Sequence, residues 1–234
     1  MPSLEKLLKF PILFLFIITV STGFSQEEQV TLQFVTFPKW TEREPIEMAV
    51  GKGEVLELTV PSNSFSKPYQ VRKLPQWVFG RPTTDKDGKP SFEVFGQGQS
   101  LNSKNQLIIL IRLGKSPSDG LKVIALDNRL AEFGGGDFFF LNASNFDVAG
   151  KMGETQFALK PSNHELIKLA PGDIHTHEGI QFVHTVLFYR DNIKSNPFFS
   201  STWPANPKAR SMIFFYHSGA NNRIRMHTIQ EYIP

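Results

Sequence analysis

Cysteine is absent from this chain of 234 residues. No disulfide can therefore form, and a lipid anchor attached through an N-terminal cysteine is excluded. Because secreted eukaryotic sandwich domains often contain disulfides, the absence favours bacterial export. An excess of one charge is also absent, with 25 Lys and Arg against 22 Asp and Glu. The formal charge of +3 predicts neither a nucleic-acid partner nor binding to a strongly anionic surface.

Long apolar runs are scarce, and the one near the N-terminus is Phe10–Val20. Two lysines precede this run and small residues follow it, which is the order of a secretory signal peptide. The run is shorter than the ~18–20 apolar residues that a membrane span requires. We therefore expect a signal peptide at 1–25, cleaved between Gly23 and Gln26, and no membrane span after it. The predicted location is the periplasm or the extracellular space.

A sustained helical period is missing too, and short strand-like runs alternate instead with Gly, Pro, Asn and Asp. The strands expected in the first half are 30–37, 45–50, 54–60, 69–73, 76–80, 91–96, 106–113 and 121–126. Those expected in the second half are 137–142, 145–150, 154–159, 164–169, 179–190, 197–202, 210–217 and 223–229. Strands this short and this frequent predict an all-β fold of sandwiches or barrels.

An internal repeat organises these strands. Residues 45–66 align with residues 145–166, and six of the 22 positions are identical, including Pro-Ser-Asn in both copies. The apolar residues of LELTV and of the aligned QFALK have opposite parity, which a bulge or a local realignment must absorb. The repeat predicts two tandem, internally duplicated antiparallel β-sandwich domains, immunoglobulin-like in size, at 26–127 and 128–234.

Motifs for catalysis are not found: the sequence has no Gly-x-Ser-x-Gly nucleophile, and the three glycines at 134–136 are not followed by the Gly-Lys-Ser/Thr of a phosphate-binding loop. We therefore expect a non-catalytic protein without a cofactor. All six histidines lie in the second half. In an extended segment, His175 and His177 would share one face and could begin a metal site. In the alternative interpretation this segment is a polar turn, and because two ligands are too few for a closed zinc site we expect no metal.

Candidate ligand residues also gather in the second half. Arg223, Arg225 and His227 alternate along the last expected strand and would form a basic stripe able to hold a carboxylate or a phosphate. Arg210 and Trp203 complete the set, because an exposed indole could stack on a sugar ring. Alternatively, the stripe is the solvated face of an edge strand and the tryptophan belongs to the core. The expected partner is an anionic small molecule, a glycan or another exported protein.

In the segment 202–229, a Trp-Pro pair and an arginine precede an apolar strand and a Gly/Asn turn. The positions concerned are Trp203, Pro204, Arg210, Ile213, Phe214 and Arg223. This pattern resembles the end of uncharacterised, signal-bearing bacterial secreted proteins, and the resemblance implies export without a known activity. We expect a binding or structural module of the bacterial periplasm or cell surface. The alternatives are a factor similar to the pilus-assembly chaperones and a metal-dependent enzyme that uses the histidine pair.

Export predicts a shortened mature protein. Sequencing the N-terminus of protein recovered from the producing cells should give a first residue between Phe24 and Glu27, because the small residues Ser21, Thr22, Gly23 and Ser25 suit a signal peptidase. Recovery of an intact Met1 from a cytosolic fraction would contradict export.

Overall fold

The computed structural model of the protein describes residues 28–39, 46–51, 53–115, 119–191, 194–218 and 223–233. The expected signal peptide at 1–25 lies outside these ranges. Within them the chain is all-β, with 17 strands, one 3-10 turn at Pro171–Asp173 and no α-helix. The described residues include no helix of the length and apolarity that crossing a membrane requires.

The strands follow the expected order closely. The first half, residues 28–127, contains β1 (Gln29–Phe37), β2 (Ile46–Ala49), β3 (Val55–Leu58), β4 (Tyr69–Arg72), β5 (Gln76–Thr84), β6 (Pro90–Gln99), β7 (Asn105–Arg112) and β8 (Leu121–Asp127). The second half, residues 128–233, contains β9 (Phe138–Asn142), β10 (Asp147–Met152), β11 (Thr155–Leu159), β12 (His164–Ile167), β13 (His175–His177), β14 (Ile180–Asp191), β15 (Lys194–Pro204), β16 (Ala209–Ser218) and β17 (Arg223–Tyr232). Each expected strand overlaps one of these. The short β13 is additional and corresponds to the extended alternative for its segment.

These strands form four sheets. In the first half, sheet A has the order β4-β1-β7-β8 and sheet B the order β3-β2-β5-β6. In the second half, sheet C has the order β12-β9-β16-β17, and sheet D has the order β11-β10-β14-β13, with β15 also paired to β14. If β13 is set aside, the two halves have the same strand order.

The expectation of purely antiparallel sheets is wrong. β1 pairs in parallel with β7, and β9 pairs in parallel with β16. Such pairs need a long crossover connection rather than a hairpin, and here the chain passes through the other sheets between the paired strands. The strand order also differs from that of immunoglobulin domains, in which sheets A-B-E-D and C-F-G face each other. In both halves of this protein the first strand lies inside its sheet, not at an edge.

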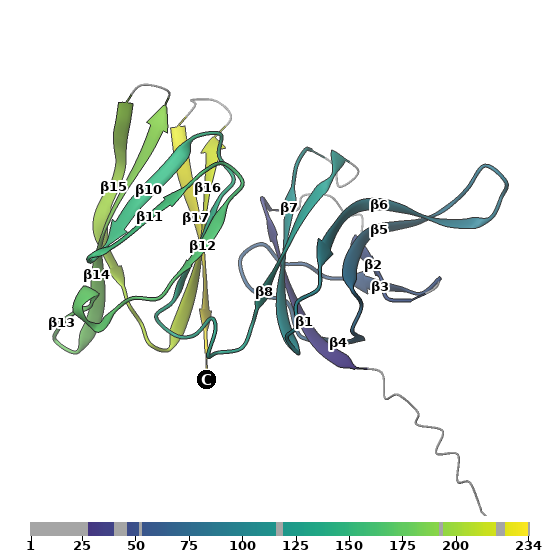
Figure 1. Ribbon diagram of the computed structural model, residues 1–234, viewed down its shortest axis with the longest axis horizontal. Helices are drawn as coiled ribbons and strands as arrows, with labels where there is room; N and C mark the ends of the chain where they lie inside the picture. The colour runs from purple at the N-terminus through teal and green to yellow at the C-terminus, as the bar shows by residue number, and fades with distance from the viewer. Residues whose placement is uncertain are drawn as a thin grey trace, which may run out of the picture.

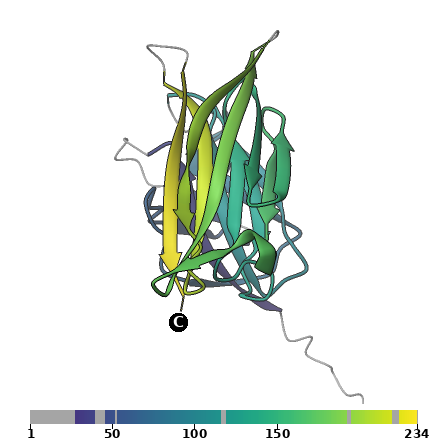
Figure 2. The same cartoon turned by 90° about the vertical axis from the view of Figure 1, so that its left-hand side faces the viewer.

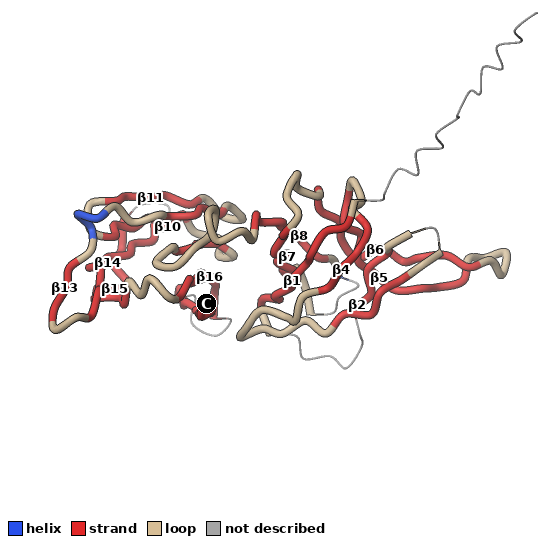
Figure 3. Tube along the Cα trace, turned by 90° about the horizontal axis from the view of Figure 1, so that it is seen from below, coloured by secondary structure: helices blue, strands red, loops and turns tan. Residues whose placement is uncertain are grey.

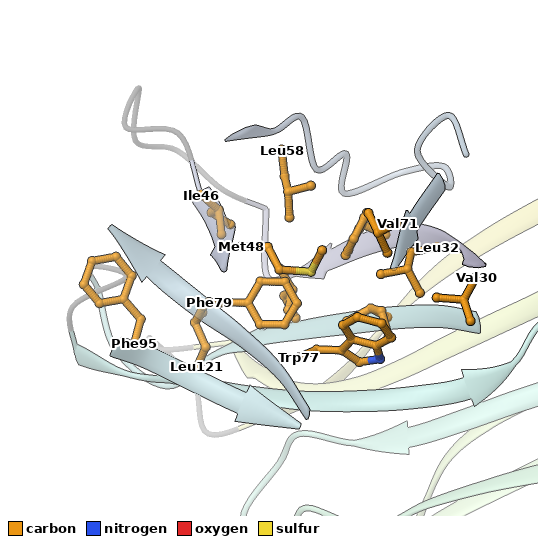
Figure 4. Close-up of a cluster of buried hydrophobic side chains, with 13 residues drawn as sticks. Val30, Leu32, Ile46, Met48, Leu58, Val71, Trp77, Phe79, Phe95 and Leu121 are labelled. Atoms are coloured by element: carbon orange, nitrogen blue, oxygen red, sulfur yellow. The ribbon is translucent and has the colours of Figure 1, made fainter. Parts of the chain in front are cut away.

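The four sheets stack in the order B, A, C, D, from right to left in Figure 1. Figure 3 shows the two halves side by side from below, and Figure 2 shows the molecule from the side of sheet D. A cluster of buried apolar side chains fills each of the three spaces between neighbouring sheets. In the cluster between sheets B and A (Figure 4), the indole of Trp77 donates to Oε1 of Gln106 at 2.9 Å. The middle cluster contains residues of both halves.

The position of sheets A and C inside the stack explains their unbroken apolar runs. In β7, Ile108 and Leu110 pack in the cluster toward sheet B, whereas Ile109 packs in the cluster toward sheet C. In β9, Phe140 packs toward sheet D and Phe139 toward sheet A. Because strands buried on both faces need apolar residues at every position, their sequences are the continuous runs LIILI and FFFL.

The contact between the halves is centred on stacked aromatic rings. The rings of Phe37 and Phe214 lie 4.7 Å apart with their planes inclined by 10°. The Nε2 of His227 lies 2.9 Å from the carbonyl oxygen of Ser62, and Lys122 Nζ donates to the carbonyl oxygen of Ser162. Both serines belong to the repeated Pro-Ser-Asn. Each copy of the motif therefore contacts the last strand of the other half.

The register of strand pairing absorbs the parity conflict noted between LELTV and QFALK. Met48 pairs with Leu56, whereas Val148 pairs with Leu159. Because Met48 and Val148 are both fully buried at aligned positions, the spatial counterpart of Leu56 is Leu159. The shift arises because seven residues separate Met48 from its partner, whereas ten residues separate Val148 from its partner.

Replacing Phe214 with alanine should lower the free energy of unfolding by about 3–5 kcal/mol, because it removes a fully buried ring between the halves. The cluster is shared, so we expect one cooperative urea transition, shifted to a lower concentration. Tyr232→Ala is the control, since Tyr232 is 70% exposed and its loss should change stability by less than about 0.5 kcal/mol. A variant with two separate transitions, one of them at the wild-type midpoint, would contradict a shared core.

Candidate functional site

Arg210 is a buried residue of the contact between the halves, with 3% of its surface exposed. Its Nε and Nη2 each lie 2.6 Å from Oε2 of Glu231, and its Nη1 donates to the carbonyl oxygen of Phe133 at 2.7 Å. The guanidinium also lies over the rings of Phe65 and Phe133, at 5.1 and 4.7 Å. Its donors are thus engaged within the fold, and Arg210 is not open to a ligand.

The basic stripe on β17 divides into two parts. Arg223 and Arg225 are exposed, whereas His227 is half-buried and stacks on Phe37 with ring centroids 5.7 Å apart. Alternation does place the three residues on one face, as expected, and Arg225 pairs across the sheet with Tyr216. The stripe therefore consists of two exposed cations, and its histidine belongs to the contact between the halves.

Trp203 lies on the other side of sheet C. Its ring stacks on Phe138 and Phe140 at 6.0 and 6.1 Å in the cluster between sheets C and D, and it stays half-exposed. Arg210 and His227 belong to the side that faces sheet A. The five residues expected to bind a ligand are therefore not brought together.

His175 and His177 are exposed on β13, on the same face. The His175 ring lies 5.9 Å from that of Phe182, and Nε2 of His177 lies 3.9 Å from Oε1 of Glu178. Among the described residues there is no group of three or more His, Cys, Asp or Glu side chains that could hold a metal ion. That no metal is needed stays a prediction.

Asp173, next to this histidine pair, is engaged by the fold. It is 2% exposed and accepts hydrogen bonds from the N–H groups of Glu154 and Ala170, at 2.5 and 2.9 Å, and from the Thr155 hydroxyl at 2.9 Å. Burial by itself would raise the pKa of this carboxyl, but the hydrogen bonds outweigh it and hold the pKa below its ordinary value. Asp173 therefore stays ionised at neutral pH and anchors the turn between β10 and β11.

A cleft of about 550 Å³ lies between the two halves, within the range typical of small-molecule sites. Because β1 runs parallel to β7 and β9 runs parallel to β16, the carboxyl ends of these four strands meet here. The lining residues are Phe37, Pro38, Ile111, Arg112, Leu113, Lys122, Leu141, Asn142, Ala143, Ser144, Asn145, Pro161, Ser162, Tyr216 and His217. Both halves contribute equivalent strand ends to it.

The walls of the cleft combine apolar and cationic groups. Phe37 and Tyr216 supply aromatic surface, with ring centroids 5.3 Å apart. Arg112 and Lys122 come from the first half and His217 from the second, and no Asp or Glu is among the described lining residues. A cavity with positive groups and no carboxylate favours a negatively charged ligand.

Desolvation is the main electrostatic effect at this cleft. Burial lowers the pKa of the Lys122 ammonium below its ordinary value. Burial and, secondly, the charge of Lys122 lower the pKa of the adjacent His164, so this imidazole is neutral at pH 7. A bound anion would offset the free-energy cost of desolvating the charged Lys122 ammonium.

Sequence reasoning missed the residues of this cleft, although two signals for them were present. Lys122 lies on the same face of β8 as Ile124 and Leu126, because side chains alternate along a strand. It therefore places a charge on a face that is otherwise apolar and packed against the other half. Arg112 and His217 directly follow the apolar runs of β7 and β16. Polar and basic residues at such positions indicate where a buried interface opens to solvent.

Comparison with known proteins found no protein-family model and no curated protein that matches the chain.

The arginines of β16 and β17 should differ in their effect on stability. Arg210→Gln should lower the free energy of unfolding by roughly 3 kcal/mol, because it leaves the half-buried Glu231 without its partner. The double variant Arg223→Gln/Arg225→Gln should leave the melting temperature nearly unchanged, since both side chains are exposed. Calorimetry checks both variants, and equal destabilisation would contradict the difference in burial between Arg210 and the two arginines of β17.

Proposed function

We propose that this chain is an exported, non-catalytic binding protein of the bacterial periplasm or cell surface. In this proposal it consists of two duplicated β-sandwiches that hold an organic anion in the cleft between them. The observation that carries the proposal is the lining of this cleft. Two cationic side chains of the first half and an imidazole of the second line one partly apolar cavity, and no carboxylate is among the described residues that line it.

Duplication is supported by the equal strand order of the two halves and by their reciprocal contacts through Pro-Ser-Asn. The strand registers agree with it as well. Ile111 pairs with Lys122 in the first half in the same way that Tyr216 pairs with Arg225 in the second. A ligand site between two related halves uses equivalent strand ends from each of them.

The cleft suits an anion with an apolar body. Phe37 and Tyr216 would pack on the apolar part, while the guanidinium of Arg112 and the ammonium of Lys122 would hold a carboxylate, sulfonate or phosphate. Partial burial strengthens such a pair relative to one at an exposed surface.

Binding without catalysis is supported by the partners of Ser144, a hydroxyl group of the cleft. Its Oγ lies 2.6 Å from Oδ1 of Asn142, so the described contact is to an amide rather than to a base. The ring of His217 lies 4.7 Å from that of Phe146. No activated nucleophile is formed by these contacts.

Anilinonaphthalene sulfonate, an anion with an apolar ring system, is a suitable probe. We expect the folded wild-type protein to bind it with saturable fluorescence. The double variant Arg112→Gln/Lys122→Gln should bind it about tenfold more weakly, because two charge-assisted contacts are lost. Titration by fluorescence and by calorimetry measures both affinities.

Lys86→Gln/Lys89→Gln is the matched control, because both lysines are exposed at the tip of the β5–β6 hairpin and their replacement removes the same two positive charges elsewhere. Melting temperatures show whether each variant is folded, because the probe also binds unfolded chains. Equal affinity of the cleft variant and the control would contradict the proposal.

A further inference from the structure

The second half contains a separate pocket on the side of sheet C that faces away from the cleft. Residues of β9, β15, β16 and β17 enclose about 140 Å³, close to the size of a cavity that holds one benzene-sized ring. Phe138 and Ile213 form its apolar floor, and Trp203 forms a wall. Its polar lining groups are Ser211, Thr228 and Gln230.

The first half has no room for such a pocket at the corresponding place. There β6 lies directly on β8: a Cβ atom at Gly98 would lie 2.6 Å from Cγ1 of Val123, and one at Gly96 would lie 2.3 Å from the carbonyl oxygen of Leu121. No comparable contact joins β15 and β17 in the part of the chain that the structure describes. The pocket is thus a property of the second half and not of the shared strand order.

A change of residue size accompanies this difference. Gly98 pairs with Trp77 in the first half, and Phe199 pairs with Leu187 at the corresponding place in the second. Phe199 thus stands on β15 where β6 has Gly98, and its ring lies 5.2 Å from that of Trp203. These rings keep β15 from approaching β17 as closely as β6 approaches β8.

Trp203 is held in one orientation by its neighbours. Its ring plane is inclined by 23° to Phe138 and by 17° to Phe140, yet the residue stays half-exposed. Neither its indole N–H nor the side chains of Thr228 and Gln230 form a hydrogen bond with another described residue. A rigid aromatic surface beside polar groups of this kind is pre-organised for a ligand.

We propose that this pocket binds one ring of a neutral sugar. A pyranose has a face of C–H groups, whose partial positive charge suits the negative face of an indole, and a rim of hydroxyl groups. The amide of Gln230 and the hydroxyl of Thr228 can each donate and accept hydrogen bonds with that rim. No charged side chain is among the described residues of the pocket, so its ligand differs in class from the anion of the cleft.

The experiment uses the mature protein and four neutral disaccharides: cellobiose, N,N′-diacetylchitobiose, maltose and lactose. Saturation-transfer NMR detects weak binding, and tryptophan fluorescence gives the affinity at millimolar sugar. We expect saturable binding of at least one disaccharide. Trp203→Ala should abolish it, and Gln230→Ala should weaken it about tenfold, as truncation of a central contact does.

Two kinds of variant keep the test decisive. Thr228 and Gln230 are exposed, so their replacement leaves the fold intact even if loss of Trp203 loosens its packing. Gln99→Ala removes an exposed amide at the end of β6 and should leave sugar binding unchanged.

Absence of saturable binding by all four sugars would overturn the proposal. The same holds if sugars bind the Trp203 and Gln230 variants as tightly as the wild type, or if p-cresol, a neutral aromatic ligand, binds here and no sugar does. Since the cleft is tested with an organic anion and with other variants, failure of one proposal leaves the other standing.

Discussion

Sheets A and C must each be covered on both faces, and the rest of the structure depends on this requirement. Every strand at their centres therefore supplies apolar side chains to two clusters at once, as Ile108 and Ile109 do in β7. A separated first half would expose the buried side chains of Val35, Leu107 and Ile109 in one contiguous patch. The two halves are consequently bound to each other by the same force that forms their individual cores.

The same contact accounts for the position of the cleft. Parallel pairing of β1 with β7 and of β9 with β16 directs four strand ends to one end of the interface between the halves. Polar and charged residues begin there, at Arg112 and His217, because the strands leave the buried layer. Lys122 is held against the carbonyl of Ser162 at a cost in desolvation, which its lowered pKa reflects.

Equal strand order has not led to equal surfaces. His227 occupies a place on β17 that Ile124 occupies on β8, and it uses that place to reach Ser62. Gly98 allows β6 to close on β8, whereas Phe199 and Trp203 occupy β15 and a pocket remains beside β17. The two halves thus differ in side-chain size at a few positions, although their strand order is the same.

The sequence by itself determined the strands of this protein, because alternation and turn residues act over a few neighbouring positions. The apolar runs LIILI and FFFL also indicate strands that are buried on both faces. Which sheet covers each face is not evident from these runs. The tertiary structure decided which polar residues are available to a ligand. Arg210 and Arg223 both look like surface cations in sequence, yet only Arg210 meets Glu231 and the carbonyl of Phe133, which lies 77 positions away. Burial and hydrogen bonding of this kind depend on contacts between distant segments, and local sequence does not contain them.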